Sequence, residues 1–291
     1  MDDLEKLRAH QHLSIAKKGK EKTGSVSLAV TKNGGEFFAG NVASDTHLLD
    51  FTSVQVALSC AKNRNDLAVE KIVTLQGEEN SGGSLLLSIK VIADFSGRID
   101  APIAYTVYDF SGKEIFSTRD VKKEVPFYVP KVSPLVERLK VQPSSNSVTS
   151  KETNKTTELQ KYAIEGVTRN LPTYDAASGY GVAVLLEDGQ IVFGGQYGSY
   201  DNRLGMHAEM SVVLDALMNH PGQKILELAL VSTKYEDEPC SICGACLQFF
   251  SEISDRYNLD IKYHCFAFKN ETVKTFSLQE LLPQRWTSKN W

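Results

Sequence analysis

Hydrophobic and polar positions follow one another along the chain in blocks that predict strands joined by tight turns. The stretch Gly24–Gly40, GSVSLAVTKNGGEFFAG, is an apolar run, a polar turn at Asn33-Gly34 and a second apolar run. An Asn-Gly or Asp-Gly pair between two apolar runs is typical of a β-hairpin. The stretch Gly179–Gly195, GYGVAVLLEDGQIVFGG, has the same form around Asp188-Gly189, so the sequence predicts two hairpins.

The two hairpins are part of a longer repeat. Residues 51–58 and 207–217 both have the apolar spacing of a helix, and residues 103–110 and 261–268 both have the composition of a strand. The offset between corresponding positions drifts only from 155 residues at the hairpins to 158 at these strands. Two unrelated domains would not keep such a register, so we predict an internal duplication. Each half is expected to run helix, hairpin, helix, strand, helix, strand, helix.

A polar segment separates the two halves. Residues 143–157 read PSSNSVTSKETNKTT, with Val148 as the clearly apolar side chain, so the segment cannot bury itself. We therefore expect one domain over residues 1–125, a linker over 126–157 and a second domain over 158–291. Strands that alternate with helices predict the α/β class, with a mixed sheet and helices on its faces in each domain.

Composition excludes several classes of protein. The formal net charge of the 291 residues is −4 and the pI is about 5.9, which argues against a protein that coats nucleic acid. The sequence has no apolar run of about 18 residues, the length that a membrane-spanning helix needs. The N-terminus is acidic and lacks the apolar stretch of a signal peptide. We expect a cytoplasmic protein whose cysteines are thiols or metal ligands.

Three of the five cysteines lie within seven residues, in EPCSICGACLQFF. Cys240, Cys243 and Cys246 are each three positions apart, so they form two overlapping C-x-x-C pairs. Cys60 and Cys265 stand alone in apolar surroundings and are predicted to be small core side chains. A structural zinc site normally has four protein ligands, and no fourth cysteine stands near this cluster. Spacing alone does not decide which two sulfurs would bind a metal.

A histidine and a glutamate precede the cysteine cluster in His207-Ala208-Glu209, at the expected start of a helix. One histidine and two cysteines around zinc leave one position open, which is typical of a catalytic zinc. Glu209 is placed to exchange protons with water in that position. An H-x-E motif followed by C-x-x-C is the signature of zinc deaminases. A structural zinc held by Cys240, Cys243, Cys246 and a distant histidine is the alternative, but it leaves Glu209 without a role.

Beyond these motifs, the sequence resembles the cytidine deaminase family. The segments that carry the resemblance are CGACLQFFSEI, LQELLP at 278–283 and SGYGVAV at 178–184. The resemblance covers residues 158–291 and extends to the N-terminal half only as a degraded copy. It implies two cytidine-deaminase-like α/β/α domains of three layers, of which the C-terminal one is catalytic and the N-terminal one degenerate.

The resemblance also bears on the choice of zinc ligands. Gln248 follows Cys246 by two positions, as in the family, and this register makes Cys243 and Cys246 the ligands together with His207. Against it, the family has proline just before its first cysteine ligand, and here Pro239 precedes Cys240. The register favours Cys243 and Cys246, with Cys240 as a bystander and one zinc per chain.

The activity that the resemblance implies is hydrolytic deamination of cytidine, deoxycytidine or a related cytosine nucleoside to the uracil product and ammonia. Such an aminohydrolase would act in pyrimidine salvage as a homodimer. Glu209 would be catalytic, and the expected substrate-binding residues are Gln196, Tyr180 and Ala208. The family usually has a carboxylate that binds ribose where this chain has Gly198. Alternatives are a deaminase of cytosine in a polynucleotide or of a modified nucleoside, and a non-catalytic zinc-binding relative.

The N-terminal half is expected to bind no zinc. Aligning the repeats sets Phe51-Thr52-Ser53 against His207-Ala208-Glu209, and it sets Leu85 and Ser88 against Cys243 and Cys246. None of these N-terminal residues is a common zinc ligand. The duplication therefore predicts one half that has the zinc ligands and the catalytic glutamate and one half that has only the fold.

Overall fold

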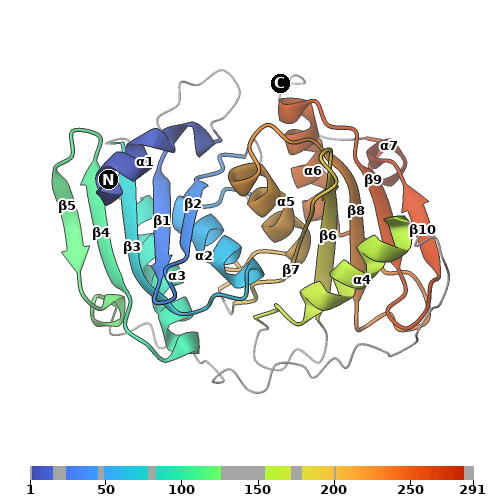
Figure 1. The fold of residues 1–291 in the computed structure, drawn as a ribbon, viewed down its shortest axis with the longest axis horizontal. Helices are drawn as coiled ribbons and strands as arrows, with labels where there is room; N and C mark the ends of the chain where they lie inside the picture. The colour runs from blue at the N-terminus through green and yellow to red at the C-terminus, as the bar shows by residue number, and fades with distance from the viewer. Residues whose placement is uncertain are drawn as a thin grey trace. The chain divides into compact units, whose positions relative to one another are not determined.

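The computed structural model describes residues 2–15, 24–44, 49–77, 83–125, 155–171, 179–199 and 201–284. The chain divides into two compact units (Figure 1). Unit 1 comprises Met1–Val136 with Ser199–Leu204, and unit 2 comprises Glu137–Gly198 with Gly205–Trp291. The predicted linker lies outside the described residues except for residues 155–157, which already form the start of a helix.

Unit 1 contains a five-stranded mixed sheet in the order β2-β1-β3-β4-β5. Its strands are β1 (Val26–Thr31), β2 (Glu36–Gly40), β3 (Val69–Gln76), β4 (Ala104–Asp109) and β5 (Glu114–Thr118). Its helices are α1 (Asp3–Ala9), α2 (Ser53–Asn63) and α3 (Gly83–Ile99), with 3-10 turns at Gln11–Leu13 and Val121–Lys123. Strands β3 and β4 are parallel and the other neighbours are antiparallel.

Unit 2 contains a second five-stranded sheet with the corresponding order β10-β9-β8-β6-β7. Its strands are β6 (Tyr180–Leu186), β7 (Ile191–Gly195), β8 (Ile225–Ser232), β9 (Lys262–Phe266) and β10 (Val273–Phe276). Its helices are α4 (Lys155–Val167), α5 (Ala208–Asn219), α6 (Gly244–Tyr257) and α7 (Leu278–Leu281). Here too the central pair, β8 and β9, is parallel. The predicted α/β class with mixed sheets is confirmed.

The strand registers confirm the internal duplication. Val26 pairs with Gly40 in the first hairpin and Gly181 pairs with Gly195 in the second, so both partners shift by 155 positions. The turns also match, because Gly34 and Gly189 both adopt a positive φ, of 84° and 87°. Glycine reaches that backbone region without the steric penalty that other residues incur. The hairpins predicted from Asn33-Gly34 and Asp188-Gly189 are both present.

Each sheet has helices on both faces. In unit 2, α4 crosses the near face in Figure 1, where Leu159 and Ala163 pack on Ala183 and Ala229. The contact is close, since a Cβ atom added at Gly181 would come within 2.0 Å of the Ala163 carbonyl oxygen. Helix α5 packs on β6 and β7. Strand residues alternate between faces, so the sheet separates the side chains that meet α4 from those that meet α5.

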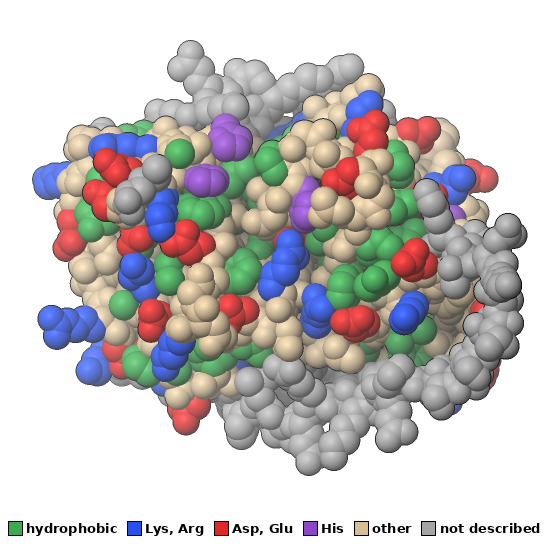
Figure 2. Space-filling view, in the orientation of Figure 1, with side chains coloured by type: hydrophobic (Ala, Val, Ile, Leu, Met, Phe, Trp, Pro, Cys, Tyr) green, Lys and Arg blue, Asp and Glu red, His purple; other side chains and the backbone are tan. Residues whose placement is uncertain are grey.

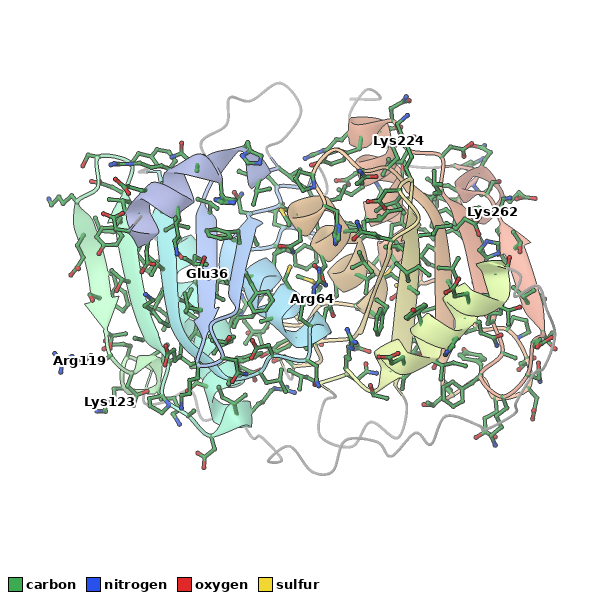
Figure 3. All side chains as sticks on the ribbon, viewed as in Figure 1. Glu36, Arg64, Arg119, Lys123, Lys224 and Lys262 are labelled. Carbon is green, nitrogen blue, oxygen red and sulfur yellow. The ribbon has the colours of Figure 1, made fainter. Side chains whose placement is uncertain are left out.

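In unit 1, helix α1 corresponds in position to α4. Leu7 of α1 packs on Val26, Leu28 and Val73 of the sheet. Lys6 of the same helix forms an ion pair with Glu36 of β2, which is labelled in Figure 3. Ser27 points to the opposite face, where it meets the first residue of α2. Both units therefore have the three-layer arrangement that the resemblance implied.

Three elements differ from the prediction from sequence, two strands and one helix. Strands β5 and β10 were not predicted, because they are short edge strands whose exposed charged positions hide the alternation, as in VKTF at Val273–Phe276. The final helix expected in the N-terminal half is, within the described residues, only the 3-10 turn Val121–Lys123. No helix in the described ranges is both long and apolar enough to cross a membrane.

Candidate active site

The expected site residues lie at one end of the strands of the unit 2 sheet. Strand β7 ends at Gly195, which pairs with Gly181, and β8 ends at Ser232, which pairs with Tyr180. From this end of the sheet the chain continues from β7 to α5 and from β8 to α6. Loops at the carboxyl ends of strands are where α/β sheets commonly bind ligands. The topology therefore brings two helix starts to the same end of the sheet.

His207 and Cys243 stand at these two helix starts. His207 is the N-cap of α5 and Cys243 is the N-cap of α6, as the helical patterns predicted. The Cys243 sulfur accepts a hydrogen bond from the backbone N–H of Cys246 at 3.5 Å. A helix N-terminus carries free N–H groups and partial positive charge, which favour a thiolate. Helix geometry also places Cys246 one turn after Cys243, on the same side.

The side chains of His207, Cys243 and Cys246 converge. The His207 Nδ1 atom lies 3.3 Å from the Cys243 sulfur and 3.4 Å from the Cys246 sulfur. All three ligand atoms lie within 4.8 Å of one another. Cys246 is buried whereas Cys243 is exposed. One nitrogen and two sulfurs would leave one position of a tetrahedral zinc without a protein ligand, so the donor set suits a catalytic rather than a structural ion.

The three groups share protons when no metal holds them. The hydrogen bond from the Cys246 thiol is the largest influence that lowers the pKa of Cys243, to about 4, and the His207 imidazole adds to it. The same hydrogen bond to Cys243, together with burial, raises the pKa of Cys246. The hydrogen bond to Cys243 also raises the pKa of His207. The cluster thus contains one thiolate next to two proton donors, which a divalent cation would replace.

Cys240 lies outside this cluster. It is buried, and its thiol donates a hydrogen bond to the Leu230 carbonyl oxygen at 3.3 Å. Contact with the thiol of Cys265, followed by burial, raises the pKa of Cys240. Leu230 is also the partner of Cys265 in the β8–β9 register. The structure therefore groups Cys243 with Cys246 and turns Cys240 toward the core, and the assignment of the zinc ligands stays a prediction.

Glu209 lies in the first turn of α5, two residues after His207, and only 4% of it is exposed. Burial is the main cause that raises the pKa of its carboxyl group, while the neighbouring His207 opposes the rise. Cys246 forms a hydrogen bond with the same carboxyl group. A carboxyl group in this environment can hold and release a proton closer to neutral pH than an exposed one. The predicted proton shuttle is thus adjacent to the predicted ligands.

The expected substrate-binding residues lie at the same end of the strands as the candidate metal ligands. Tyr180 opens β6, Gln196 follows β7, and Ala208 is the buried first residue of α5. Gln196 is fixed through its backbone, because its N–H donates to the Asn170 side-chain oxygen at 2.8 Å and its carbonyl accepts from Leu171 at 2.9 Å. The clamp by Asn170 was not predicted, since nothing in the sequence marks it. Roles in substrate binding stay predictions.

Among the described residues, the one group that could hold a metal ion lies in unit 2. The alignment of the two repeats needs one correction. The bridges Val42–Phe51 and Tyr197–Met206 correspond at an offset of 155. Thr52, rather than Phe51, therefore matches His207, and both residues are N-caps. The predicted match of Phe51 to His207 was wrong by one position, because the drift toward 158 occurs after α2.

The match of Ser88 to Cys246 agrees with the structure. Helices α3 and α6 both end before a residue of positive φ, at Asp100 and Asn258, which differ by 158 positions. At the N-terminal side, α3 continues past the position of Leu85, where α6 has its cap at Cys243. The helix start that presents Cys243 in unit 2 is thus absent from unit 1.

Hydroxyl groups occupy the core next to Thr52 in unit 1. Ser53 bonds to Ser25 at 2.9 Å and to Ser27 at 2.7 Å, and Ser27 bonds to Thr74 at 2.7 Å. All four side chains are buried. Their donors and acceptors satisfy one another, so the cluster needs no metal or ligand.

Comparison with known proteins gives matches of fold. No protein-family model and no curated protein matches the chain. Among solved structures, the chain is similar to cytidine deaminases. The protein from Burkholderia pseudomallei is 20% identical, with a TM-score of 0.40, and the match covers 46% of this chain and 100% of that one. The protein from Mycobacterium leprae is 25% identical, with a TM-score of 0.35 and coverage of 46% and 100%.

Proposed function

We propose that the chain is a zinc-dependent hydrolase that deaminates a cytosine nucleoside to the uracil product and ammonia. The observation that carries the proposal is the buried carboxyl group of Glu209 beside the converging His207, Cys243 and Cys246. A purely structural zinc site would not need a buried acid next to it. Burying a carboxyl group destabilises its charged form, so such a group is typical of functional sites.

Each residue would have a distinct role. His207, Cys243 and Cys246 would hold zinc, which when bound makes a water in the open position more acidic. Glu209 would accept a proton from that water and deliver it to N3 of the cytosine ring as the hydroxyl bonds to C4. It would then take the proton of the new C4 hydroxyl and pass it to the amine, which leaves as ammonia while the C4 carbonyl forms. Its burial supports this role, because a raised pKa makes the carboxyl group able both to accept and to donate a proton.

A small substrate fits the surface better than a polynucleotide does. On the face drawn in Figure 2, acidic and basic side chains are interspersed over the described residues, without a continuous basic stripe. Proteins that bind single strands usually combine a basic groove with stacking aromatic residues. The acidic pI of about 5.9 points the same way. The proposed substrate is therefore a free nucleoside, whose sugar contacts differ from those of cytidine deaminases because Gly198 has no carboxylate.

Parallel assays of ammonia release test this proposal. Zinc-loaded protein would be given cytidine, deoxycytidine, a sugar-modified cytosine nucleoside and a single-stranded oligonucleotide. We expect turnover of at least one free nucleoside, loss of turnover after zinc is removed with a chelator, and recovery when zinc is restored. Turnover of the oligonucleotide alone would favour the polynucleotide reading, and zinc binding without any turnover would favour a non-catalytic relative. The expected homodimer is tested separately by sedimentation of the same protein.

A further inference from the structure

A histidine on strand β9 connects two polar side chains on the neighbouring strands of unit 2. The His264 Nε2 atom lies 2.9 Å from a carboxylate oxygen of Glu227, on β8, and its Nδ1 atom lies 2.9 Å from the hydroxyl oxygen of Thr275, on β10. His264 is also the partner of Thr275 in the strand register. The three side chains therefore form a chain of hydrogen bonds across the sheet, from a carboxylate through an imidazole to a hydroxyl.

These side chains lie on the face of the sheet that is turned away from the candidate zinc site. Phe266, two positions after His264, belongs to the apolar cluster that packs against α4. Tyr263, one position before His264, contacts Phe250 of α6, with 5.2 Å between the ring centroids. Because strand residues alternate between faces, His264 shares the face of α4, whereas α6 covers the other face. The chain of hydrogen bonds is thus separate from the proposed deaminase site.

The positions of the protons follow from what each group can donate or accept. The Glu227 carboxylate only accepts, so Nε2 of a neutral His264 carries the proton that is donated to it. The Nδ1 atom is then an acceptor, and Thr275 donates its O–H to it. Burial lowers the pKa of His264, which favours this neutral form. A neutral imidazole that is oriented by a carboxylate and accepts a hydroxyl proton is the arrangement that activates a nucleophile.

The hydroxyl end of this chain is open to solvent. Thr275 is exposed, and together with Glu227 it lines a surface cavity of about 500 Å³. Lys262, labelled in Figure 3, lines the same cavity and is the partner of Glu227 in the register of β8 and β9. A small molecule in this cavity would meet a hydroxyl group and an ammonium group on one face of the sheet.

A backbone donor lies beside the hydroxyl. Ala267 donates its N–H to the carbonyl oxygen of Thr272 at 2.9 Å, so these two residues form a hydrogen-bonded pair of the β9–β10 ladder. Such pairs alternate with pairs that exchange no backbone bonds, and Thr275 with His264, three positions farther along, is a pair of the second kind. The N–H of Thr275 is therefore directed away from β9, and β10 is the last strand of this sheet in the described ranges. This N–H and Lys262 would stabilise negative charge that develops on a carbonyl oxygen.

The fold itself does not require this set of residues. In unit 1 the pair that corresponds to His264 and Thr275 is Thr106 and Ser117, whose hydroxyl oxygens lie 3.3 Å apart. Lys71 stands there at the position of Glu227. Two small hydroxyl side chains are thus sufficient to pair the same strands. The carboxylate, imidazole and hydroxyl are an addition of unit 2 rather than a requirement of the sheet.

We propose that Thr275, His264 and Glu227 form a second hydrolytic site, which cleaves small esters through an acyl intermediate on Thr275. The Thr275 oxygen adds to the ester carbonyl carbon while its proton passes to His264 Nδ1. The bond from the acyl carbon to the alcohol oxygen breaks, and the alcohol leaves with this proton. Water then adds to the acyl carbon and gives a proton to His264. The bond to Thr275 breaks, the acid leaves, and the Thr275 oxygen regains the proton.

Hydrolysis of p-nitrophenyl acetate by the full zinc-loaded chain tests the proposal. Thr275→Val keeps the size of the side chain and removes the hydroxyl, and His264→Gln removes the base. Each should slow the release of p-nitrophenol by about 100-fold relative to wild type. Thr275→Ser should still turn over, because it keeps a hydroxyl in place. Wild type quenched with acid should carry an acetyl group on Thr275, which mass spectrometry finds on the tryptic peptide that follows Lys274.

Two controls separate this activity from other reactions of the chain. Thr106→Val removes the corresponding hydroxyl of unit 1, whose partner is Ser117, and should leave the rate unchanged. Removal of zinc with a chelator should also leave the rate unchanged, and a loss of ester hydrolysis together with zinc would overturn the proposal. Equal rates in wild type and Thr275→Val would overturn it as well. If Thr275→Val does not fold, the wild-type protein decides, because an acetyl group on Cys243 but not on Thr275 would refute the second site.

Discussion

The two repeats have corresponding strands and the same start of the first core helix, but they differ in the side chain that this helix start presents. In unit 2 the N-cap of the first core helix is His207, whose side chain makes no capping bond and turns to Cys243 and Cys246. In unit 1 the N-cap is Thr52, which forms a full capping box with Gln55. At this backbone site the side chain either caps the helix, as Thr52 does, or turns away from the helix N–H groups toward the two sulfurs, as His207 does.

The buried side chains beside these helix starts also differ, since they are polar in unit 1 and apolar in unit 2. Unit 1 has Ser27, Ser53 and Thr74 in one hydrogen-bonded chain. At the corresponding positions unit 2 has apolar side chains: Val182, Ala208 and Leu230. Unit 1 thus has a polar cluster within its core at positions where unit 2 has apolar side chains. Apolar surroundings strengthen electrostatic interactions, which suits a metal site.

The largest expected effect is the loss of the proton shuttle, which has no counterpart in unit 1. Glu209→Gln should reduce kcat by roughly 10²–10⁴-fold, because the amide cannot carry a proton. Zinc content should stay near one per chain, since no ligand changes. Steady-state kinetics with metal analysis on the same sample tests this. High activity in a zinc-replete variant would remove Glu209 from the mechanism.

Removing a proposed zinc ligand should abolish the metal binding that is expected to distinguish unit 2 from unit 1. Cys246→Ala should lower zinc affinity by more than about 100-fold, since even indirect contacts to a metal ligand contribute 10- to 100-fold. Cys240→Ala is the matched control, because its thiol bonds to Leu230 and should leave zinc binding intact. Competition with a chromophoric chelator measures both. Two zinc ions per wild-type chain would contradict the assignment of a single site to unit 2.

The hydroxyl chain of unit 1 should make a smaller contribution, to stability. Ser27→Ala leaves the hydroxyls of Ser53 and Thr74 without a shared partner in a buried place. Each hydrogen bond lost should lower the free energy of unfolding by about 0.5–1.5 kcal/mol, while Ser53 keeps its bond to Ser25. Denaturant unfolding followed by a probe in unit 1 measures the change, with an exposed Ser117→Ala as the control. An equal effect of the two substitutions would show that the chain of hydroxyls has no special role.

The smallest expected effect is a pH dependence confined to unit 2. His264 is buried and bonds to Glu227 and Thr275 at 2.9 Å each, whereas the corresponding pair in unit 1 is Thr106 and Ser117. Burial lowers the pKa of His264, although the hydrogen bond to Glu227 opposes this.

The folded protein therefore takes up this proton less readily than the unfolded chain does. The stability that His264 contributes is present above its unfolded pKa and is lost as the pH falls toward the lower folded value. His264→Thr, which copies unit 1, should make the melting temperature less dependent on pH between about 7 and 5. Thermal scans across this range test the sign, and the same slope in both proteins would refute it.

Much of the fold could be predicted from local patterns. The two hairpins followed from Asn33-Gly34 and Asp188-Gly189, because a tight turn depends on a few residues and leaves a clear signal. The repeat followed from a register that hardly drifts. Edge strands β5 and β10 gave no such signal, since one of their sides faces solvent and their pairing is decided by the neighbouring strand.

The candidate site could likewise be predicted from the sequence only in part. The sequence by itself indicated His207, Glu209 and a pair of cysteines, because ligand and acid types at fixed spacing on helix starts determine the chemistry they can perform. It did not determine which cysteine turns away. That depended on β8 and β9, which place Leu230 and Cys265 where Cys240 can bond to them.

The sequence likewise did not predict that Ser199–Leu204 belongs to unit 1. Gln55 and Arg203 are 148 positions apart and carry no shared pattern, so only the folded chain brings their amide and carbonyl together. Local spacing thus determined the two helix starts and the chemistry of their side chains. The tertiary structure decided which sulfurs meet His207 and which one turns away, because those contacts join residues that are distant along the chain.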